Sequence, residues 1–438
     1  MCGMKASTVV HQLGRTFRIL RCYPNMRVTL WVLTFLAVSL GPAFGQISLP
    51  APTGAYPVGR LVLLWSDPAR LEDAGPTAGK PREIVTYIFY PGTAAGNRAE
   101  YYPGLAGLEN AAETKLLRQQ FGGAWKDVTG GTIRTNAYDG ASMPKGREKF
   151  PVLIFSPGAP APVLAYQIQL EELASHGYVV FALEHGTDSA LIIRPDHTLL
   201  PYASRREFNP IPPTAAFFEA DLKEVIRRTD DVVFVLNQIA LLVKKRDSVL
   251  GGRLDLSRIG VFGHSEGGKV AIRTCQVDAR VRACLNQDGE MFPIPYGSTE
   301  PIPSLVPGKL IVPPVAVIYV AEPGPTDAQL AAVHVTRREF DDWRAAKNKA
   351  LRSFLQENTR NSHLVTIRAP GYVHASFMDI RLLGSNPAPE AVVNQRTGTT
   401  ITRAFFDDRL HFGDRKGWSQ FVRTPGQGIT VERLSRKP

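Results

Sequence analysis

The sequence predicts an α/β fold in which helices cover both faces of a mostly parallel central sheet. Short apolar runs alternate with amphipathic stretches along much of the 438-residue chain. The runs are continuously apolar, which is typical of strands buried on both faces. Hydrophobic residues make up 44% and charged residues 21% of the chain, and this balance excludes wholesale disorder.

The predicted elements follow one another in a regular order. Two β-rich runs come first, at Arg60–Trp65 and Ile84–Tyr90, and residues 92–148 are expected to form long loops with a helix near Ala111–Phe121. The expected core strands are Val152–Ser156, Tyr178–Leu183, Ile259–Phe262, Ala283–Gln287, Val312–Ala321 and His363–Ile367. The expected helices are Gln167–His176, Phe217–Val243, Glu266–Cys275, Asp327–Gln356 and Ile401–Leu410, of which the last is expected to end the core.

The first 45 residues have the features of a targeting segment. An apolar run from Leu30 to Phe44 follows Arg27, and Ala43-Phe44-Gly45 matches a small-x-small cleavage site. A basic start, a short apolar stretch and small residues at its end are typical of a secretory signal peptide. The sequence therefore predicts a signal peptide at about residues 26–45 and a secreted or periplasmic protein. An amino-terminal membrane anchor is the alternative interpretation.

The remaining chain is expected to form one domain. Residues 1–25 are interpreted as an extension upstream of the true start, residues 46–438 as the domain, and about residues 84–412 as its core. The formal net charge of +11 includes five basic residues of the leader, and removing them leaves 46 basic against 40 acidic residues. A mild excess of this kind without a basic tract gives no indication of nucleic-acid binding.

Two cysteines remain beyond the leader, Cys275 and Cys284. Export would allow a disulfide between them, and two partly buried thiols are the alternative. The nine histidines are scattered, and no Cys-x-x-Cys or His-x-x-x-His pair occurs. The sequence therefore predicts neither a metal site nor a cofactor.

A Gly-x-Ser-x-Gly pattern occurs at Gly263-His264-Ser265-Glu266-Gly267. An apolar strand leads into it and a helix leaves it, as the nucleophile elbow of an α/β-hydrolase requires. Glycines on both sides allow the sharp turn, because a Cβ there would collide with neighbouring backbone. The helix amino terminus behind Ser265 would favour developing negative charge. The alternative is a glycine-rich turn with an incidental serine.

A serine nucleophile needs a base that an acid orients, and in this fold the chain order is Ser, acid, His. His374 lies in the loop after the last core strand and is the predicted base. His363 begins that strand and is interpreted as structural, whereas His185 precedes the serine and breaks the order. Asp288 and Asp327 both follow strands, and position alone leaves the choice of acid open.

The oxyanion hole requires two backbone N–H groups directed at the tetrahedral oxygen. Glu266 N–H, directly after the nucleophile, is the first expected donor. The second should come from the loop at residues 157–162, where three prolines lack an N–H. Gly158, Ala159 and Ala161 remain, and Ala159 is the predicted donor because it lies where the loop should turn over the site. The alternative is that residues 157–162 form only a rigid connection and supply no oxyanion donor.

From about residue 84 to 412 the chain resembles bacterial relatives of plasma-type platelet-activating-factor acetylhydrolase. These are lipid-directed serine esterases of the α/β-hydrolase superfamily. The resemblance rests on Phe150–Gly158, Leu173–His185, Gly252–Gly268, Asn286–Pro293, Gly371–Asp379 and Ala404–Leu410. It implies that Asp288 is the acid, that the substrate is a short-acyl or lipid-like ester, and that no metal takes part.

The chain departs from the family pattern at three places. Pro157 stands where the family usually has His, and Glu266 stands where it usually has an apolar residue. The stretch from Asp327 to Ser362 is longer than a minimal core needs and is interpreted as a candidate lid. These departures concern the substrate more than the mechanism.

Together these features predict a secreted serine esterase with Ser265, Asp288 and His374 as its catalytic residues. The expected partner is a small-molecule or lipid ester, with transient contact to a membrane or lipid surface. A peptidase or polyester hydrolase of the same fold is one alternative. A non-catalytic α/β-hydrolase-like binding protein is the other, because a fold does not by itself imply an activity.

Overall fold

The computed structural model describes residues 47–203, 214–245, 247–295, 298, 300–306, 308–384 and 387–436. The leader expected at residues 1–45 lies outside the described residues, so the signal peptide stays a prediction. Within the ranges described, no helix combines the length and the apolar character needed to cross a membrane.

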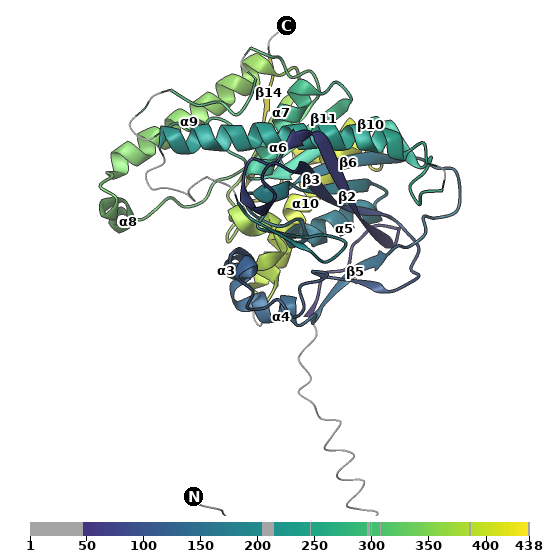
Figure 1. Cartoon of the computed structure of the whole chain (residues 1–438). Helices are drawn as coiled ribbons and strands as arrows, with labels where there is room; N and C mark the ends of the chain where they lie inside the picture. Colours follow the sequence, from purple (N-terminus) through teal and green to yellow (C-terminus); the bar gives the residue numbers. More distant parts are fainter. Residues whose placement is uncertain are drawn as a thin grey trace, which may run out of the picture. The chain divides into compact units, whose positions relative to one another are not determined.

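The described residues contain a central sheet of twelve strands (Figure 1). Its strands are β1 (Ile47–Ser48), β2 (Val58–Leu71), β3 (Pro81–Pro91), β4 (Arg98–Glu100), β5 (Ile133–Asp139), β6 (Phe150–Ser156), β7 (Val179–Glu184), β10 (Leu254–His264), β11 (Val281–Gln287), β12 (Val315–Val320), β13 (Ser362–Ile367) and β14 (Ile429–Leu434). They lie in the order β1-β5-β2-β3-β7-β6-β10-β11-β12-β13-β14, with β4 paired to β5. The run from β7 to β13 is parallel, and β3 and β14 flank it antiparallel. A separate hairpin joins β8 (Leu191–Ile193) and β9 (Leu199–Pro201).

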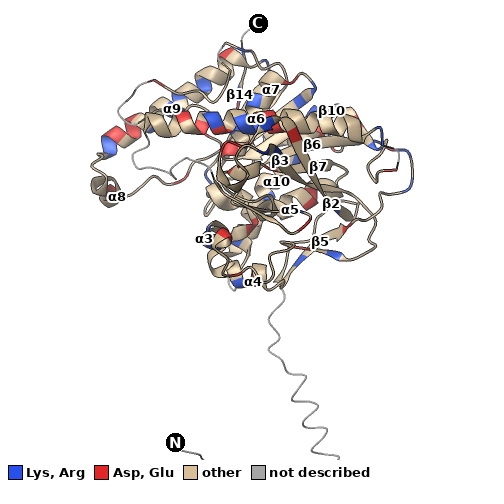
Figure 2. Cartoon of the chain, viewed as in Figure 1, with Lys and Arg blue, Asp and Glu red and all other residues tan. Residues whose placement is uncertain are grey.

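The helices connect and cover these strands. They are α3 (Lys115–Phe121), α4 (Trp125–Thr129), α5 (Gln167–Ser175), α6 (Ala215–Leu242), α7 (Glu266–Val277), α8 (Asp327–Ala332), α9 (Arg337–Asn358), α10 (Pro389–Arg409) and α11 (Gly417–Arg423). Short 3-10 turns occur at Gly75–Thr77, Ala112–Thr114, Gly122–Ala124, Val163–Tyr166, Gly186–Asp188, His374–Phe377 and Asp379–Leu382. Charged residues of both signs are interspersed along α6 and α9 (Figure 2).

Successive residues of the central strands face two different cores. In β6, Val152 and Ile154 pack in a core that includes apolar residues of α6, α7 and α9. Leu153 and Phe155 pack in a second core with apolar residues of α5 and α10. Helices therefore cover both faces of the sheet, which explains why these strands are continuously apolar. The predicted α/β-hydrolase architecture is confirmed.

Three element predictions were wrong. The helix at Ile401–Leu410 does not end the core, because β14 follows and pairs antiparallel with β13. Residues 92–148 are more than loops and a helix, because β5 within them joins the main sheet. The helix expected over Asp327–Gln356 is two helices, because the capping box of Thr336 starts α9 anew.

Cys275 in α7 and Cys284 in β11 form a disulfide. The bond joins the helix that follows Ser265 to the strand that leads to Asp288. Of the two interpretations that the sequence leaves open, the structure therefore has the bridged one.

Candidate active site

Ser265 occupies a strained turn between β10 and α7. Its backbone has φ 55° and ψ −120°, a conformation that residues other than glycine rarely adopt. A Cβ at Gly263 would lie 2.3 Å from the carbonyl carbon of Gly267. A Cβ at Gly267 would lie 1.9 Å from the carbonyl oxygen of Ser156. Both glycines are therefore required by close backbone contacts, as the elbow pattern predicts.

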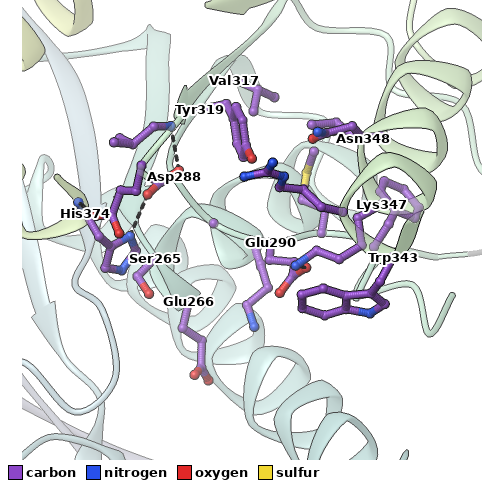
Figure 3. A pocket seen from close by; sticks show the side chains of 18 of the residues that line it. Ser265, Glu266, Asp288, Glu290, Val317, Tyr319, Trp343, Lys347, Asn348 and His374 are labelled. Atoms are coloured by element: carbon purple, nitrogen blue, oxygen red, sulfur yellow. Dashed lines mark hydrogen bonds and ion pairs between the residues drawn. The ribbon is translucent and has the colours of Figure 1, made fainter. Parts of the chain in front are cut away.

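The structure brings Asp288 and His374 into contact from separate loops. His374 Nδ1 lies 2.6 Å from Asp288 Oδ2. The other carboxylate oxygen of Asp288 accepts a hydrogen bond of 2.8 Å from Val320 N–H. Ser265, Asp288 and His374 line the same pocket and gather on one side of it (Figure 3).

Asp327, the other acid candidate, lies elsewhere. It begins α8, its side chain is 84% exposed, and it forms a 2.9 Å ion pair with Arg337. The residue does not contact His374. This geometry favours Asp288 over Asp327 as the partner of the predicted base, His374.

Burial and charge act in opposite directions on this pair. Burial lowers the pKa of His374, but the hydrogen bond to Asp288 and the charges of Asp288 and Glu322 outweigh it, so the pKa lies above its usual value. Burial raises the pKa of Asp288, and its hydrogen bond to His374 offsets this only in part. Glu322 also accepts a hydrogen bond from His374 N–H, which restrains the backbone of the predicted base.

The loop expected to supply the second oxyanion donor lies beside the elbow. Gly158 N–H donates a 3.1 Å hydrogen bond to the hydroxyl of Tyr166. Ala159 lines the pocket together with Ser265 and Glu266. Of the candidate donors in this loop, Gly158 is thus engaged within the protein, whereas Ala159 lies at the pocket.

A buried arginine of α6 contacts both sides of the expected oxyanion hole. Arg228 Nη1 donates a 3.2 Å hydrogen bond to the carbonyl of Pro157. Its Nε lies 3.8 Å from a carboxylate oxygen of Glu266, and both side chains are almost fully buried. The charge at Glu266, unusual for the family that the sequence resembles, therefore lies against a buried cation.

The pocket has a volume of about 720 Å³, and α9 forms the wall across from the candidate catalytic residues. Trp343 Nε1 donates a 2.7 Å hydrogen bond to the carbonyl of Ile294. Lys347 Nζ lies 3.9 Å from the centre of the Trp343 ring and forms an ion pair with Glu290. The segment interpreted as a candidate lid thus contributes a polar and aromatic wall that is attached to the loop after Asp288.

The two other histidines considered from the sequence are buried away from this pocket. His185 contacts Ser156 Oγ at 2.8 Å and Asp231 at 2.9 Å, and burial lowers its pKa to about 4. His363 packs its ring 5.3 Å from that of Trp418, and burial lowers its pKa to about 4 as well. Neither residue lines the pocket.

Comparisons with known proteins find esterases and acetylhydrolases among the similar proteins. The family model described as platelet-activating factor acetylhydrolase, isoform II, matches residues 42–200. A probable 1-alkyl-2-acetylglycerophosphocholine esterase of Arthroderma benhamiae is 28% identical over 253 residues, which cover 56% of this chain and 59% of that protein. The chain is related to the platelet-activating factor acetylhydrolases. The acetylhydrolase of Cavia porcellus is 24% identical over 294 residues, which cover 61% of each chain.

These matches to the acetylhydrolases are partial. The chain spans about three fifths of the length of the curated relatives that it matches. The structure of the ferulic acid esterase from Streptomyces cinnamoneus superposes on this chain with a TM-score of 0.60 at 21% sequence identity. The superposition covers 88% of this chain and 99% of the esterase. At that identity the likeness concerns the fold alone.

Several residues around the site were not found from the sequence. Tyr166, Arg228 and Glu322 contact the loops that carry the predicted residues, but none of them belongs to a recognisable pattern. Their partners lie 8, 71 and 52 positions away in the chain. His264 lies inside the Gly-x-Ser-x-Gly pattern, where any residue is allowed. Only three-dimensional contacts identify these four.

Proposed function

We propose that the protein is a serine esterase that hydrolyses short-acyl or lipid-like carboxylic esters through an acyl-enzyme. The observation that carries this proposal is the 2.6 Å contact between His374 Nδ1 and Asp288, in a pocket that Ser265 also lines. The names of the related proteins, an esterase and acetylhydrolases, support an ester as the substrate.

In the first half of the reaction, Ser265 Oγ attacks the ester carbonyl carbon while His374 Nε2 takes the hydroxyl proton. The N–H groups of Glu266 and Ala159 stabilise the negative charge on the carbonyl oxygen. Asp288 stabilises the imidazolium that forms. His374 then gives its proton to the leaving alcohol oxygen as the bond between carbonyl carbon and alcohol oxygen breaks. The acyl group remains on Ser265.

In the second half, water takes the place of the alcohol. His374 removes a proton from water, and the resulting hydroxide oxygen attacks the acyl carbon. Collapse of the tetrahedral intermediate breaks the bond to Ser265 Oγ, which recovers its proton from His374. The acid product leaves, and the protein returns to its starting state.

The pocket supports substrates larger than an acetyl ester of a small alcohol. Its volume of about 720 Å³ lies within the range of sites that bind drug-sized ligands. Phe217, Phe218, Met291 and Phe292 add apolar lining, whereas α9 adds polar and aromatic groups. An ester with one apolar and one polar part matches these walls.

We also propose that the protein is exported through the segment at residues 26–45. The disulfide between Cys275 and Cys284 supports this proposal, because such bonds persist in oxidising compartments. Sequencing the amino terminus of the product released by the producing cell tests it. A mature end near Gln46 is expected, and a soluble cytoplasmic product that retains Met1 would contradict it.

A panel of p-nitrophenyl esters with increasing acyl length, run beside a phospholipid with a short sn-2 chain, tests the esterase proposal. Ser265→Ala serves as the matched control for uncatalysed and contaminating hydrolysis. We expect turnover of short-acyl esters that Ser265→Ala lacks. Equal rates for both proteins across the whole panel would contradict the proposal and favour a non-catalytic binding protein.

A further inference from the structure

We propose that Tyr166 and His264 are positioning residues that tie the oxyanion loop, residues 157–162, to the loop that carries His374. This inference rests on the proposed function, because it assigns a role to residues that support the same reaction. Neither side chain is expected to touch the substrate. Their role is to fix the position of the oxyanion loop relative to the loop that carries His374, with Ser265 between the two loops.

An unbroken chain of hydrogen bonds joins the two loops. Gly158 N–H lies 3.1 Å from Tyr166 Oη, and Tyr166 Oη lies 2.8 Å from His264 Nδ1. On its other side, His264 Nε2 lies 2.9 Å from the carbonyl oxygen of His374. The chain therefore begins one residue before Ala159 and ends on the backbone of the base itself.

The direction of each bond follows from its end points. A carbonyl oxygen can only accept, so His264 Nε2 must carry a proton and donate it to His374. Gly158 N–H can only donate, so Tyr166 Oη accepts from it and turns its own O–H toward His264 Nδ1. Neutral His264 with an unprotonated Nδ1 completes every bond in this chain.

The surroundings of His264 keep it in that neutral form. Its side chain is almost fully buried, and burial lowers its pKa well below the usual value, with the charge of His374 acting in the same direction. Burial raises the pKa of Tyr166, so its hydroxyl keeps its proton. Both groups therefore hold the required protonation state across the pH range in which His374 would titrate.

Close packing restricts the movement of the side chains that form this chain of hydrogen bonds. The rings of His264 and His374 have centroids 4.4 Å apart, and Phe377 covers His264 at 5.2 Å. A Cβ on Gly158 would lie 3.2 Å from Ser265 Cβ and 3.3 Å from His264 Nδ1. The oxyanion loop thus lies directly against the nucleophile, so a small shift of Gly158 would move Ala159 N–H relative to the reacting carbonyl.

The test is Tyr166→Phe, which removes one hydroxyl and keeps the ring. Tyr178→Phe is the matched control, because Tyr178 is also buried and its hydroxyl donates a 2.7 Å hydrogen bond to Asp407, away from the pocket. A misplaced oxyanion donor costs part of the 10²- to 10³-fold that its complete removal costs. We therefore expect Tyr166→Phe to lower kcat by about 10- to 100-fold, with KM changed less than about threefold.

The Tyr178→Phe control separates an effect on the position of the oxyanion loop from a general loss of stability. Tyr178→Phe should lower the melting temperature at least as much as Tyr166→Phe, yet keep kcat near the wild-type value. As a second variant, His264→Phe keeps a ring and removes both of its bonds, so it should lower kcat as Tyr166→Phe does. The double variant Tyr166→Phe/His264→Phe should be little worse than the poorer single variant, because both break one chain.

Three outcomes decide the inference. Wild-type kcat in folded Tyr166→Phe would overturn it, and so would equal losses of kcat in Tyr166→Phe and Tyr178→Phe. Multiplied losses in the double variant would also overturn it, because the two residues would then act independently. If Ser265→Ala hydrolyses the same ester as fast as wild type, the proposed function itself has failed, and this outcome is distinct from the other three.

Discussion

Replacing Asp288 by Asn should disable His374 as the base, because it should stabilise the wrong tautomer of the imidazole ring. Asp288 Oδ1 accepts from Val320 N–H at 2.8 Å, and Oδ2 faces His374 Nδ1 at 2.6 Å. In Asp288→Asn, the amide oxygen would keep the Val320 bond, because the reverse orientation would set the amide NH₂ against a backbone N–H. The NH₂ group would then donate to His374 Nδ1. This forces the proton onto Nε2, the atom that must accept the proton of Ser265.

The expected loss follows from this change of tautomer. A carboxylate that orients a catalytic histidine contributes about 10⁴-fold to turnover. That factor corresponds to about 5.5 kcal/mol in the barrier. The fold should be kept, since the side-chain shape and the Val320 bond are unchanged. The assay is kcat and KM for a short-acyl p-nitrophenyl ester, with circular dichroism as the check on folding.

Asp327→Asn is the matched control. Asp327 is 84% exposed and pairs only with Arg337 in the salt bridges of the described chain, so its loss should leave kcat within about twofold and stability within about 1 kcal/mol. A folded Asp288→Asn with kcat within tenfold of wild type would refute the role assigned to Asp288. Loss of turnover in Asp327→Asn would refute it as well.

Three further predictions concern the same site and its support. Ser265→Ala and His374→Ala should each abolish most turnover of a p-nitrophenyl ester, and the double variant should be little worse than either; multiplied losses would contradict their action as one unit. Glu322→Gln removes a negative charge that raises the pKa of His374. Because His374 must be unprotonated to act as a base, the acidic limb of the kcat/KM profile should move to lower pH. An acidic limb at the wild-type pH would contradict this cause. Replacing Cys275 and Cys284 together by Ala should lower the free energy of unfolding by about 3 kcal/mol in urea titrations, and an unchanged midpoint would show that the disulfide does not stabilise the protein.

The fold could be predicted because its central strands are buried on both faces. Val152–Phe155 is apolar throughout, and its residues alternate between two cores, so the sequence pattern records the burial directly. The edge strand β14 was missed because it has only six residues, its apolar and polar residues are mixed, and only Leu434 among them is buried. An edge strand of this kind leaves little apolar signal in the sequence.

The candidate site was predictable where a residue sits at a fixed place in the chain. Ser265 follows from the glycines that flank it, and His374 from its loop after the last parallel strand. Asp288 could not be separated from Asp327 by position, and only the resemblance to a family favoured it. The catalytic roles of these residues remain predictions that the variants above test.

The supporting contacts could not be predicted from the sequence. Arg228 reaches Pro157 across 71 positions, and His264 reaches His374 across 110. No local pattern encodes contacts of this separation, because they depend on how loops from different strands meet at one edge of the sheet. Glu266 departs from the pattern of the family that the sequence resembles, and only the structure shows that Arg228 lies beside its carboxylate.

The formation of an acyl-enzyme on Ser265 is the central claim, and intact-mass spectrometry with a fluorophosphonate tests it most directly. The reagent reacts with an activated serine and stays attached, so the adduct can be located by peptide mapping. We expect one adduct per chain on Ser265, loss of esterase activity in proportion to labelling, and no adduct in Ser265→Ala. Labelling of another residue, or full esterase activity in a chain labelled at Ser265, would contradict the account.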